Sequence, residues 1–419
     1  LGTGAGVKCY GILLDWAANA VVSNNSVFAI GLLISDSDVA SAPTAGADCW
    51  PVGINIRNTA GCVVSGNTVE DTTQNGAGTS QGISYESNGA PAVVSLAANA
   101  VNIIGNRVAT VSSLPVTVGI YVGLGQDTNA GVFTTLNTLH IADNTVYSTD
   151  FGGISVIAGG NTTLRQTTIT DNIVTTTADA TFGIGIYVAA AAATVSADGV
   201  ILGLSITGNT VASAASLGIA TQTGAGATLS NVQIRDNTLI SVTGVSIAVT
   251  ALGVPTGFDN FSITNNVITA PGDDGITFFC TDYSPTSLTV SSNSVTGAAG
   301  GVASSKGISI QTSAVGVDVN TITNLIMHQN ILNTTDDGIT LAIDGALLGA
   351  SIGGNNIHVQ AGATPFQATM SPLNPPGGET YCEDIVLSDN ILHGGTESFV
   401  SITNGLKIAN FAFTDNQVY

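Results

Sequence analysis

One arrangement of apolar and polar residues recurs along the chain. An asparagine has an apolar residue three positions before it and another two positions after it, as in Val22, Asn25 and Val27. The position five residues before the asparagine is apolar in most repeats as well. Such a fixed pattern is typical of a repeat architecture. It occurs thirteen times in 419 residues, centred on Asn25, Asn67, Asn106, Asn144, Asn172, Asn209, Asn237, Asn266, Asn293, Asn330, Asn355, Asn390 and Asn416.

Apolar residues at −5 and −3 follow the two-residue alternation of a strand that buries one face. The asparagine interrupts this alternation, and the apolar residue at +2 begins a new one. Asparagine tolerates the left-handed backbone conformation that a sharp bend requires, so we expect the asparagine itself to adopt it. Each repeat therefore predicts a strand, a bend at the asparagine and a second strand.

A second mark, a glycine followed by an aliphatic residue, predicts a third strand in each repeat. We interpret the glycine of this mark as a turn that leads into the strand. Three short strands per repeat, all coiling the same way, predict an all-β solenoid of about 12–13 coils whose equivalent strands stack in parallel. The mark is a glycine followed by an aliphatic residue, and it occurs at Gly11, Gly53, Gly82, Gly119, Gly153, Gly185, Gly218, Gly244, Gly275, Gly307 and Gly338.

This three-strand unit, with an asparagine at the bend and a Gly-Ile strand, resembles the right-handed parallel β-helix of the pectate-lyase-like superfold over nearly the whole chain. Members of that superfold include polysaccharide lyases, glycoside hydrolases, sugar epimerases, viral tailspikes and surface adhesins. The resemblance therefore implies an architecture and leaves the function open. Stacked asparagines hydrogen-bond to one another in other ladders, so we expect a structural role for the repeated asparagines.

The repeat spacing predicts one β-helix domain over residues 1–419 with loops on one edge. Successive asparagines lie 25 to 42 residues apart, and the longer units must carry loops. Two loop insertions stand out, 31–51 and 358–380. The prolines of the second insertion argue against a regular central strand there.

The Gly-Ile strands offer little acid–base chemistry. In the lyases and hydrolases that the fold resembles, catalytic and binding groups commonly lie on or beside this sheet. Here the outward series contains no Asp, Glu, His, Lys or Arg, although acid–base catalysis needs titratable groups within reach of each other. The residue after each glycine is expected to point inward and the next one outward, which gives Asn55, Ser84, Tyr121, Ser155, Tyr187, Ala220, Ser246, Thr277, Ser309 and Thr340.

A charged pair lies further along the same sheet. Arg57 and Glu86 each follow their glycine by four residues on adjacent coils, which predicts a cross-strand ion pair. A sugar-binding or catalytic role is the alternative. Together with Tyr121 and Tyr187 of the outward series, these residues are the candidate substrate contacts.

The catalytic candidates directly precede the glycine mark. In register, Lys306 falls between Asp274 and Asp337, which predicts a charge ladder at a turn. Alternatively, the two carboxylates act as an acid–base pair, because two coil steps separate them by roughly 9–10 Å, near the inverting-glycosidase range. Aspartate before Gly-Ile resembles part of the polygalacturonase pattern, but the companion Gly-His-Gly and Arg-Ile-Lys motifs of that family are absent.

Charge and composition narrow the choice of partner. The chain has 7 Lys plus Arg against 28 Asp plus Glu, a formal net charge of −21. So few cations argue against binding to nucleic acid, to an anionic lipid surface or to a polyanionic sugar. The sequence contains no run of 18 apolar residues, so it predicts no membrane span.

Acidic residues in the first insertion suggest a metal site. Asp36, Asp38 and Asp48 supply the hard oxygen ligands that calcium prefers, although their spacing does not match an EF-hand loop. A solvated acidic loop is the alternative, so the cofactor prediction is none, or calcium. The four histidines lie on different coils and show no HxxxH spacing.

Cysteine usage bears on the compartment. Cys9 and Cys49 both lie shortly before the glycine of neighbouring coils, which predicts a disulfide between them in an oxidising compartment. From the composition we expect an extracellular protein or one on a cell or virion surface.

Two function classes remain. The first is a structural or surface β-solenoid, a fibre or filament subunit that stacks end to end and contacts glycans. It is favoured because neither end of the sequence carries an amphipathic capping helix, and solenoid edges are usually covered. The second is a carbohydrate-active enzyme, a polysaccharide lyase or glycoside hydrolase of the tailspike-depolymerase type. It is favoured by the analogy of fold and by two pairs of adjacent aspartates, Asp273 with Asp274 and Asp336 with Asp337.

Overall fold

The chain forms two compact units of parallel strands. Unit 1 is Leu1–Ile201 with Asn209–Leu217, and unit 2 is Leu202–Gly208 with Gly218–Tyr419. The computed structural model describes residues 7–15, 17, 19–28, 49–59, 61–70, 80–87, 97–98, 100–110, 117–125, 134–148, 152–160, 162–176, 183–190, 199–297, 306–313, 320–370, 381–394, 400–404 and 407–419.

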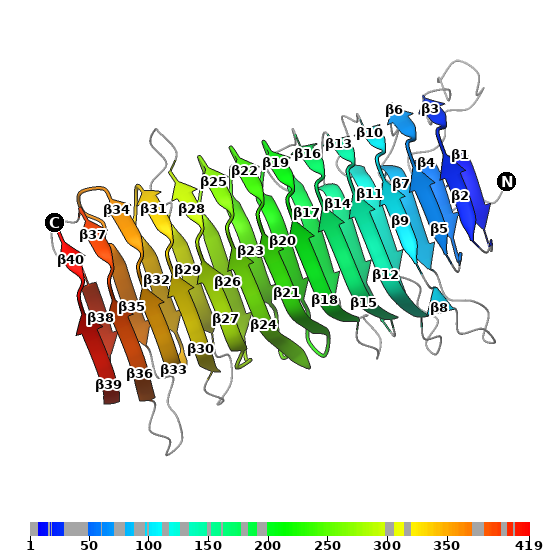
Figure 1. Cartoon of the computed structure of the whole chain (residues 1–419). Coiled ribbons are helices and arrows are strands. Elements are labelled where there is room, and N and C mark those ends of the chain that lie inside the picture. Colours follow the sequence, from blue (N-terminus) through cyan, green and yellow to red (C-terminus); the bar gives the residue numbers. More distant parts are fainter. Residues whose placement is uncertain are drawn as a thin grey trace, which may run out of the picture. The chain divides into compact units, whose positions relative to one another are not determined.

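Unit 1 contains three parallel sheets, A, B and C, each built from one strand of every coil (Figure 1). Sheet A is formed by β1 (Val7–Asp15), β4 (Cys49–Arg57), β7 (Ser80–Ser87), β11 (Thr117–Leu124), β14 (Gly152–Ala158) and β17 (Ile184–Ala190). Sheet B is formed by β2 (Ala20–Ser23), β5 (Cys62–Ser65), β9 (Val101–Ile104), β12 (Thr134–Ala142) and β15 (Thr162–Thr170), with β8 (Ala97–Ala98) paired to β12. Sheet C is formed by β3 (Ser26–Phe28), β6 (Thr68–Glu70), β10 (Arg107–Thr110), β13 (Thr145–Ser148), β16 (Ile173–Thr176) and β19 (Thr210–Ala212).

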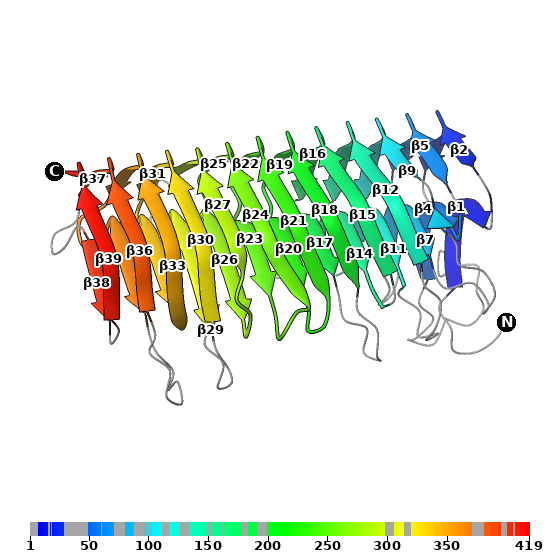
Figure 2. The same cartoon turned by 60° about the horizontal axis from the view of Figure 1, so that its bottom comes forward.

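Unit 2 repeats the three sheets, and Figure 2 shows its sheet B strands lying side by side. Sheet A of this unit has β20 (Leu217–Thr223), β23 (Val245–Ala251), β26 (Ile276–Thr281), β29 (Ile308–Ser313), β32 (Ile339–Ile343), β35 (Phe366–Met370) and β38 (Val400–Asn404). Sheet B has β18 (Val200–Thr207), β21 (Thr228–Arg235), β24 (Gly257–Thr264), β27 (Thr286–Ser291), β30 (Asn320–His328), β33 (Gly345–Gly353), β36 (Tyr381–Ser388) and β39 (Lys407–Thr414). Sheet C has β22 (Thr238–Ile240), β25 (Val267–Thr269), β28 (Ser294–Thr296), β31 (Ile331–Thr334), β34 (Asn356–Val359), β37 (Ile391–His393) and β40 (Gln417–Val418).

The three-strand coil is confirmed, and its apolar positions form the core. Within a coil the chain passes through sheet A and sheet B, bends at the repeated asparagine and enters sheet C. The −3 residues stack in register, as Val22, Val64 and Ile103 do. The +2 residues do the same, as Val27 and Val69 do. These positions are buried in every coil except the one that carries Asn416, so apolar burial between parallel strands holds the stack together.

The repeated asparagines form a buried ladder within each unit. Asn144 is representative: its Nδ2 donates to Oδ1 of Asn172 on the next coil at 2.9 Å and to the carbonyl of Ile103 on the previous coil at 2.8 Å. Its backbone N–H donates to the same Asn172 oxygen at 3.0 Å. The structural role predicted for the asparagines is therefore confirmed. The pattern runs from Asn25 to Asn209 in unit 1 and from Asn237 to Asn416 in unit 2.

The left-handed residue of each bend is the one before the asparagine, so the prediction that the asparagine itself takes this conformation was wrong. Asp171 has a φ of 54°, and Gly105 has a φ of 65°. The asparagine is thereby free to point inward and bond along the ladder. The sequence did carry this signal, because the preceding residue is always Gly, Asp, Asn, Ser or Gln, the short or polar types that occupy such turns.

The glycine of the second mark serves packing rather than a turn, which corrects its interpretation. A Cβ built on Gly153 would meet the side chain of Val174 and lie 2.6 Å from the carbonyl oxygen of Gly185. Val174 is the +2 residue of the same coil, so the two sequence marks meet in space. Equivalent contacts join Gly119 to Val146, Gly218 to Leu239, Gly275 to Val295, Gly307 to Leu332 and Gly338 to Ile357.

The second predicted insertion is shorter than 358–380. Strand β35 lies inside this range and pairs with β32 in sheet A. Pro365 does not prevent this strand, because it directly precedes β35. The proline contributes only its carbonyl to the pairing, which accepts from the Ile339 N–H at 3.0 Å. Residues 371–380, and residues 31–48 of the first insertion, lie outside the described part of the chain.

Candidate functional site

The outward row of sheet A is in register as predicted in unit 1. Asn55 pairs with Ser84, Ser84 with Tyr121, Tyr121 with Ser155, and Ser155 with Tyr187. The row is more buried than its outward position suggests, because Asn55 and Ser84 are both 0% exposed.

One member of the predicted row was placed two residues away from its true position. Ile247 of β23 pairs with Ile276, so Ala248 and not Ser246 lies beside Thr277. Ser246 occupies the position of the glycine, since its N–H donates to Asp274 as Ile247 donates to Gly275. The Gly244-Val245 dipeptide has the sequence of the glycine mark but lies two residues before the position of that mark. Only the observed strand pairing shows that Ser246, and not Gly244, aligns with Gly275.

A polar cluster lies two residues further along the row, where Asp15, Arg57, Glu86 and Gly123 are in register across β1, β4, β7 and β11. Nη2 of Arg57 donates to Oδ2 of Asp15 at 2.6 Å, and the Tyr10 ring centre lies 6.0 Å from the guanidinium. The predicted adjacency of Arg57 and Glu86 is confirmed, and Arg57 also forms an ion pair with Asp15 on the other neighbouring strand. Sequence reasoning missed Asp15, although it follows Gly11 by the same four residues.

Glu86 lies in the buried part of this cluster, at 5% exposure. Its Oε1 accepts from the Ser84 hydroxyl at 3.1 Å. Tyr121 approaches from the next coil: a Cβ on Gly123 would lie 2.6 Å from the Tyr121 hydroxyl oxygen, so the ring covers Gly123. Burial, and then the Glu86 carboxylate, raises the pKa of Tyr121 to about 12, so the phenol stays a neutral hydrogen-bond donor. Burial also raises the pKa of Tyr187.

Asn55 is the member of the cluster with unused hydrogen-bonding capacity. Within the described residues, neither Nδ2 nor Oδ1 of Asn55 makes a hydrogen bond of good geometry, and Nε of Arg57 makes none either. Its amide faces Tyr10 and lowers the pKa of that phenol slightly, against a larger rise from burial. Buried polar groups are normally satisfied, so this amide is the strongest pointer to a ligand on sheet A.

The acidic ladder forms in the predicted register. The backbone N–H of Gly275 donates to Lys306, and that of Gly307 donates to Asp337, so Lys306 lies between the two aspartates. Oδ1 of Asp274 accepts from the Lys306 N–H at 3.2 Å, and Oδ1 of Asp337 accepts from the Thr364 N–H at 2.8 Å. Each carboxylate thus caps the backbone of the next coil, which favours the structural alternative over an acid–base pair.

Asp274 nevertheless has an unusual environment for a carboxylate. Its side chain is buried, and Oδ2 accepts from the Thr277 hydroxyl at 3.2 Å. Burial raises the pKa of Asp274 above 3.8, while the backbone N–H and charge of Lys306 oppose this rise. Because the pKa of Asp274 is raised overall, the effect of desolvation outweighs that of the Lys306 charge.

The predicted metal and disulfide residues lie largely beyond the described structure. Asp36, Asp38 and Asp48 are outside the described residues, and so are the side chains of Cys9 and Cys49. The backbone places Cys9 opposite Pro51 and Cys49 opposite Val7, a two-residue stagger that disfavours the predicted disulfide. In the described ranges, no three His, Cys, Asp or Glu side chains gather closely enough to hold a metal ion.

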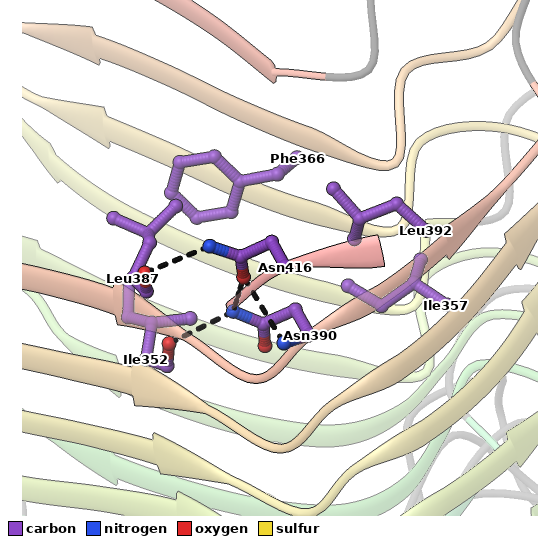
Figure 3. Close-up of a pocket in the computed structure, with 7 residues that line it drawn as sticks. All are labelled: Ile352, Ile357, Phe366, Leu387, Asn390, Leu392 and Asn416. Atoms are coloured by element: carbon purple, nitrogen blue, oxygen red, sulfur yellow. Dashed lines mark hydrogen bonds between the residues drawn. The ribbon is translucent and has the colours of Figure 1, made fainter. Parts of the chain in front are cut away.

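A recess in unit 2 belongs to the core and offers no polar binding groups. Figure 3 shows Ile352, Ile357, Phe366, Leu387 and Leu392 around two ladder asparagines. The amides of Asn390 and Asn416 are already committed. Nδ2 of Asn390 donates to the carbonyl of Ile352 and to Oδ1 of Asn416, and Nδ2 of Asn416 donates to the carbonyl of Leu387. Among the described elements, no helix is long and apolar enough to cross a membrane.

Comparison with known proteins agrees with this architecture. A family model described as "Right handed beta helix region" matches residues 91–315, more than half of the chain. No curated protein and no solved structure matches the chain. The three stacked parallel sheets, the asparagine ladder and this match together place the chain in the right-handed β-helix family.

Proposed function

We propose that the chain is an extracellular structural or surface β-solenoid that associates end to end through the coil formed by β38, β39 and β40. The supporting observation is a change in exposure at this coil. Phe413 is 46% exposed and Val418 45%, whereas Leu387 and Leu392, their register partners on the previous coil, are each 2% exposed. An apolar strand edge of this kind pairs with a further coil, and in this proposal a second copy supplies that coil.

The polarity of the ladder supports pairing with another coil. Within each unit, a ladder asparagine donates its backbone N–H and Nδ2 to the asparagine of the following coil, as Asn390 does to Asn416. Oδ1 of Asn25, in the coil that carries β2 and β3, would accept the same two bonds from Asn416 of a second copy. Head-to-tail contact repeats without closing and builds filaments.

Sedimentation velocity over a wide concentration range tests this proposal. We expect the average mass to rise with concentration, and the Phe413→Asp and Val418→Asp variants to stay monomeric. The matched control is Val254→Asp, which places the same charge on another exposed valine of unit 2 and should leave association unchanged. A wild-type chain that remains monomeric at every concentration would reject association as the role of this coil.

Carbohydrate binding at the polar cluster of Asp15, Asn55, Arg57, Glu86 and Tyr121 is the second candidate function. The amide of Asn55 favours it, because within the described residues it makes no hydrogen bond of good geometry, and sugar hydroxyls can both donate to Oδ1 and accept from Nδ2. Asp15 and Glu86 flank Arg57 two strand spacings apart, roughly 9–10 Å, so the same cluster accommodates the enzymatic alternative.

A polysaccharide screen separates binding from catalysis at this cluster. We expect the Asn55→Ala and Glu86→Gln variants to lose at least tenfold in affinity for a bound neutral glycan, whereas Gln233→Ala, on the exposed face of β21, should bind normally. Release of new reducing ends or unsaturated products by the wild type, lost in Glu86→Gln, would assign an enzyme. Affinities that do not differ between Asn55→Ala and the wild type would dismiss the cluster.

A further inference from the structure

Two histidines are neighbours on the outer face of sheet C in unit 2. Each is the third residue after its ladder asparagine, and strand pairing sets Asn333, His358 and His393 in one row across β31, β34 and β37. In-register side chains on adjacent strands start about 4.8 Å apart. His358 is exposed and His393 is half-buried, so both rings are open to solvent and ions.

The two rings already have a separation that suits a shared ligand. Their centres lie 6.0 Å apart with 46° between the ring planes. A metal–nitrogen bond of about 2.0–2.1 Å, plus roughly 1 Å from nitrogen to ring centre, puts two ligating imidazoles at most about 6 Å apart, centre to centre. Small rotations of the two side chains would therefore bring one nitrogen of each ring onto a common ion.

His393 is held in place by a third aromatic residue. The Tyr419 ring stacks on it at 4.7 Å between centres and 13° between planes. Tyr419 is itself fixed, because its N–H donates to the carbonyl of Leu392 at 2.9 Å and its hydroxyl donates to Oε1 of Gln417 at 2.8 Å. The stack covers one face of the imidazole and leaves its nitrogens, which lie in the ring plane, uncovered by Tyr419.

The other two histidines have different surroundings. Nδ1 of His140 makes a 2.6 Å hydrogen bond with the Thr168 hydroxyl, and Nε2 of His328 makes a 2.8 Å bond with the Ser351 hydroxyl. In the ranges that the structure describes, no such bond engages a ring nitrogen of His358 or His393. Only this pair therefore combines proximity with free ligating atoms.

We propose that His358 and His393 form a two-histidine site for a divalent transition metal, with Cu²⁺ bound more tightly than Zn²⁺. Neutral imidazole nitrogens suit both ions, whereas Ca²⁺ and Mg²⁺ prefer oxygen ligands. The amide oxygen of Asn333 and water supply the remaining ligands. The ion bridges His358 of β34 and His393 of β37. Because it binds the folded coils in preference to the unfolded chain, it stabilises unit 2.

Titration of the untagged chain with Cu²⁺ and with Zn²⁺ in a calorimeter tests the site. We expect one ion per chain, and at least tenfold weaker binding in His358→Ala and in His393→Ala. His140→Ala and His328→Ala are the matched controls and should bind within twofold of the wild type. Electron paramagnetic resonance of the Cu²⁺ complex should show two nitrogen ligands.

A second readout does not depend on the stoichiometry. Zn²⁺ should raise the urea midpoint of the wild type and leave that of the His358→Ala/His393→Ala double variant unchanged, while both chains unfold alike without metal. Equal metal affinity in the double variant and the wild type would overturn the site, and so would the absence of saturable Cu²⁺ binding.

Discussion

At the scale of single residues, the ladder asparagine commits its whole amide to the neighbouring coils. Oδ1 of Asn330 accepts from the N–H and Nδ2 of Asn293, and Nδ2 of Asn330 donates to Asn355 and to the carbonyl of Val290. Aspartate could not replace it, because a carboxylate has no N–H to donate. The bend therefore requires asparagine in this register even though another residue supplies the left-handed conformation.

Removing one ladder amide should destabilise the fold strongly. Asn330→Ala leaves the Val290 carbonyl and the donors of Asn293 short of partners in a buried site, so we expect a loss of at least about 2 kcal/mol in the free energy of unfolding. Urea unfolding measures it. Asn356→Ala, on the exposed face of β34, is the control and should cost under about 0.5 kcal/mol. Similar losses in the two variants would contradict a special role for the ladder.

The buried carboxyl of Asp274 predicts a pH dependence. The pKa of Asp274 in the folded state is raised above 3.8. The protonated carboxyl therefore contributes its full share to the free energy of unfolding at low pH, and this contribution is lost as the pH rises through the folded-state pKa. Asp274→Asn keeps an acceptor for the Lys306 N–H and cannot ionise. The wild type should therefore lose stability relative to this variant as the pH rises from the ordinary aspartate value toward neutrality. Urea midpoints that differ by a constant amount over this range would disprove the coupling.

At the scale of elements, the glycine of sheet A and the apolar residue of sheet C form one packing unit. The side chain of Val174 in β16 fills the place where Gly153 of β14 would carry a Cβ. Alanine there must displace either Val174 or the backbone of β17. Strand β14 thus requires glycine at position 153 because there is no space for a Cβ atom, and the φ angle of Gly153 plays no part.

Two adjacent glycines give a matched test of this packing unit. Gly153→Ala should cost about 1–3 kcal/mol, because close-packed cores resist overpacking. Gly152→Ala should be nearly neutral, since its Cβ would meet only the Ile184 carbonyl oxygen at 3.6 Å. Differential unfolding in urea compares the two. Equal effects would show that the space at Gly153 is not limiting.

At the scale of the whole molecule, net charge opposes the association that we propose. Copies that each carry −21 repel one another over a distance that salt shortens. Because the edge of Phe413 and Val418 is apolar, raising the ionic strength from about 0.05 M to 0.5 M should strengthen association. Sedimentation at several salt concentrations checks this, and association that weakens with salt would indicate an ionic contact instead.

The architecture was readable from the sequence because a solenoid repeats one local pattern. The asparagine period, the buried −3 and +2 residues and the register of Arg57 with Glu86 all follow from counting along the chain, and the structure confirms them. The left-handed residue before each asparagine was also visible as a composition bias. These are properties of neighbouring residues, which one strand or one bend largely determines.

Contacts between strands were decided only by the tertiary structure. Within one coil this holds for Val174 over Gly153, and between coils for Asp15 as the partner of Arg57, the two-residue shift at Ile247 and the proximity of His358 to His393. A one-dimensional pattern gives the order of the strands. It does not give side-chain directions or the stagger between strands, because these depend on the packing of residues that are distant in sequence.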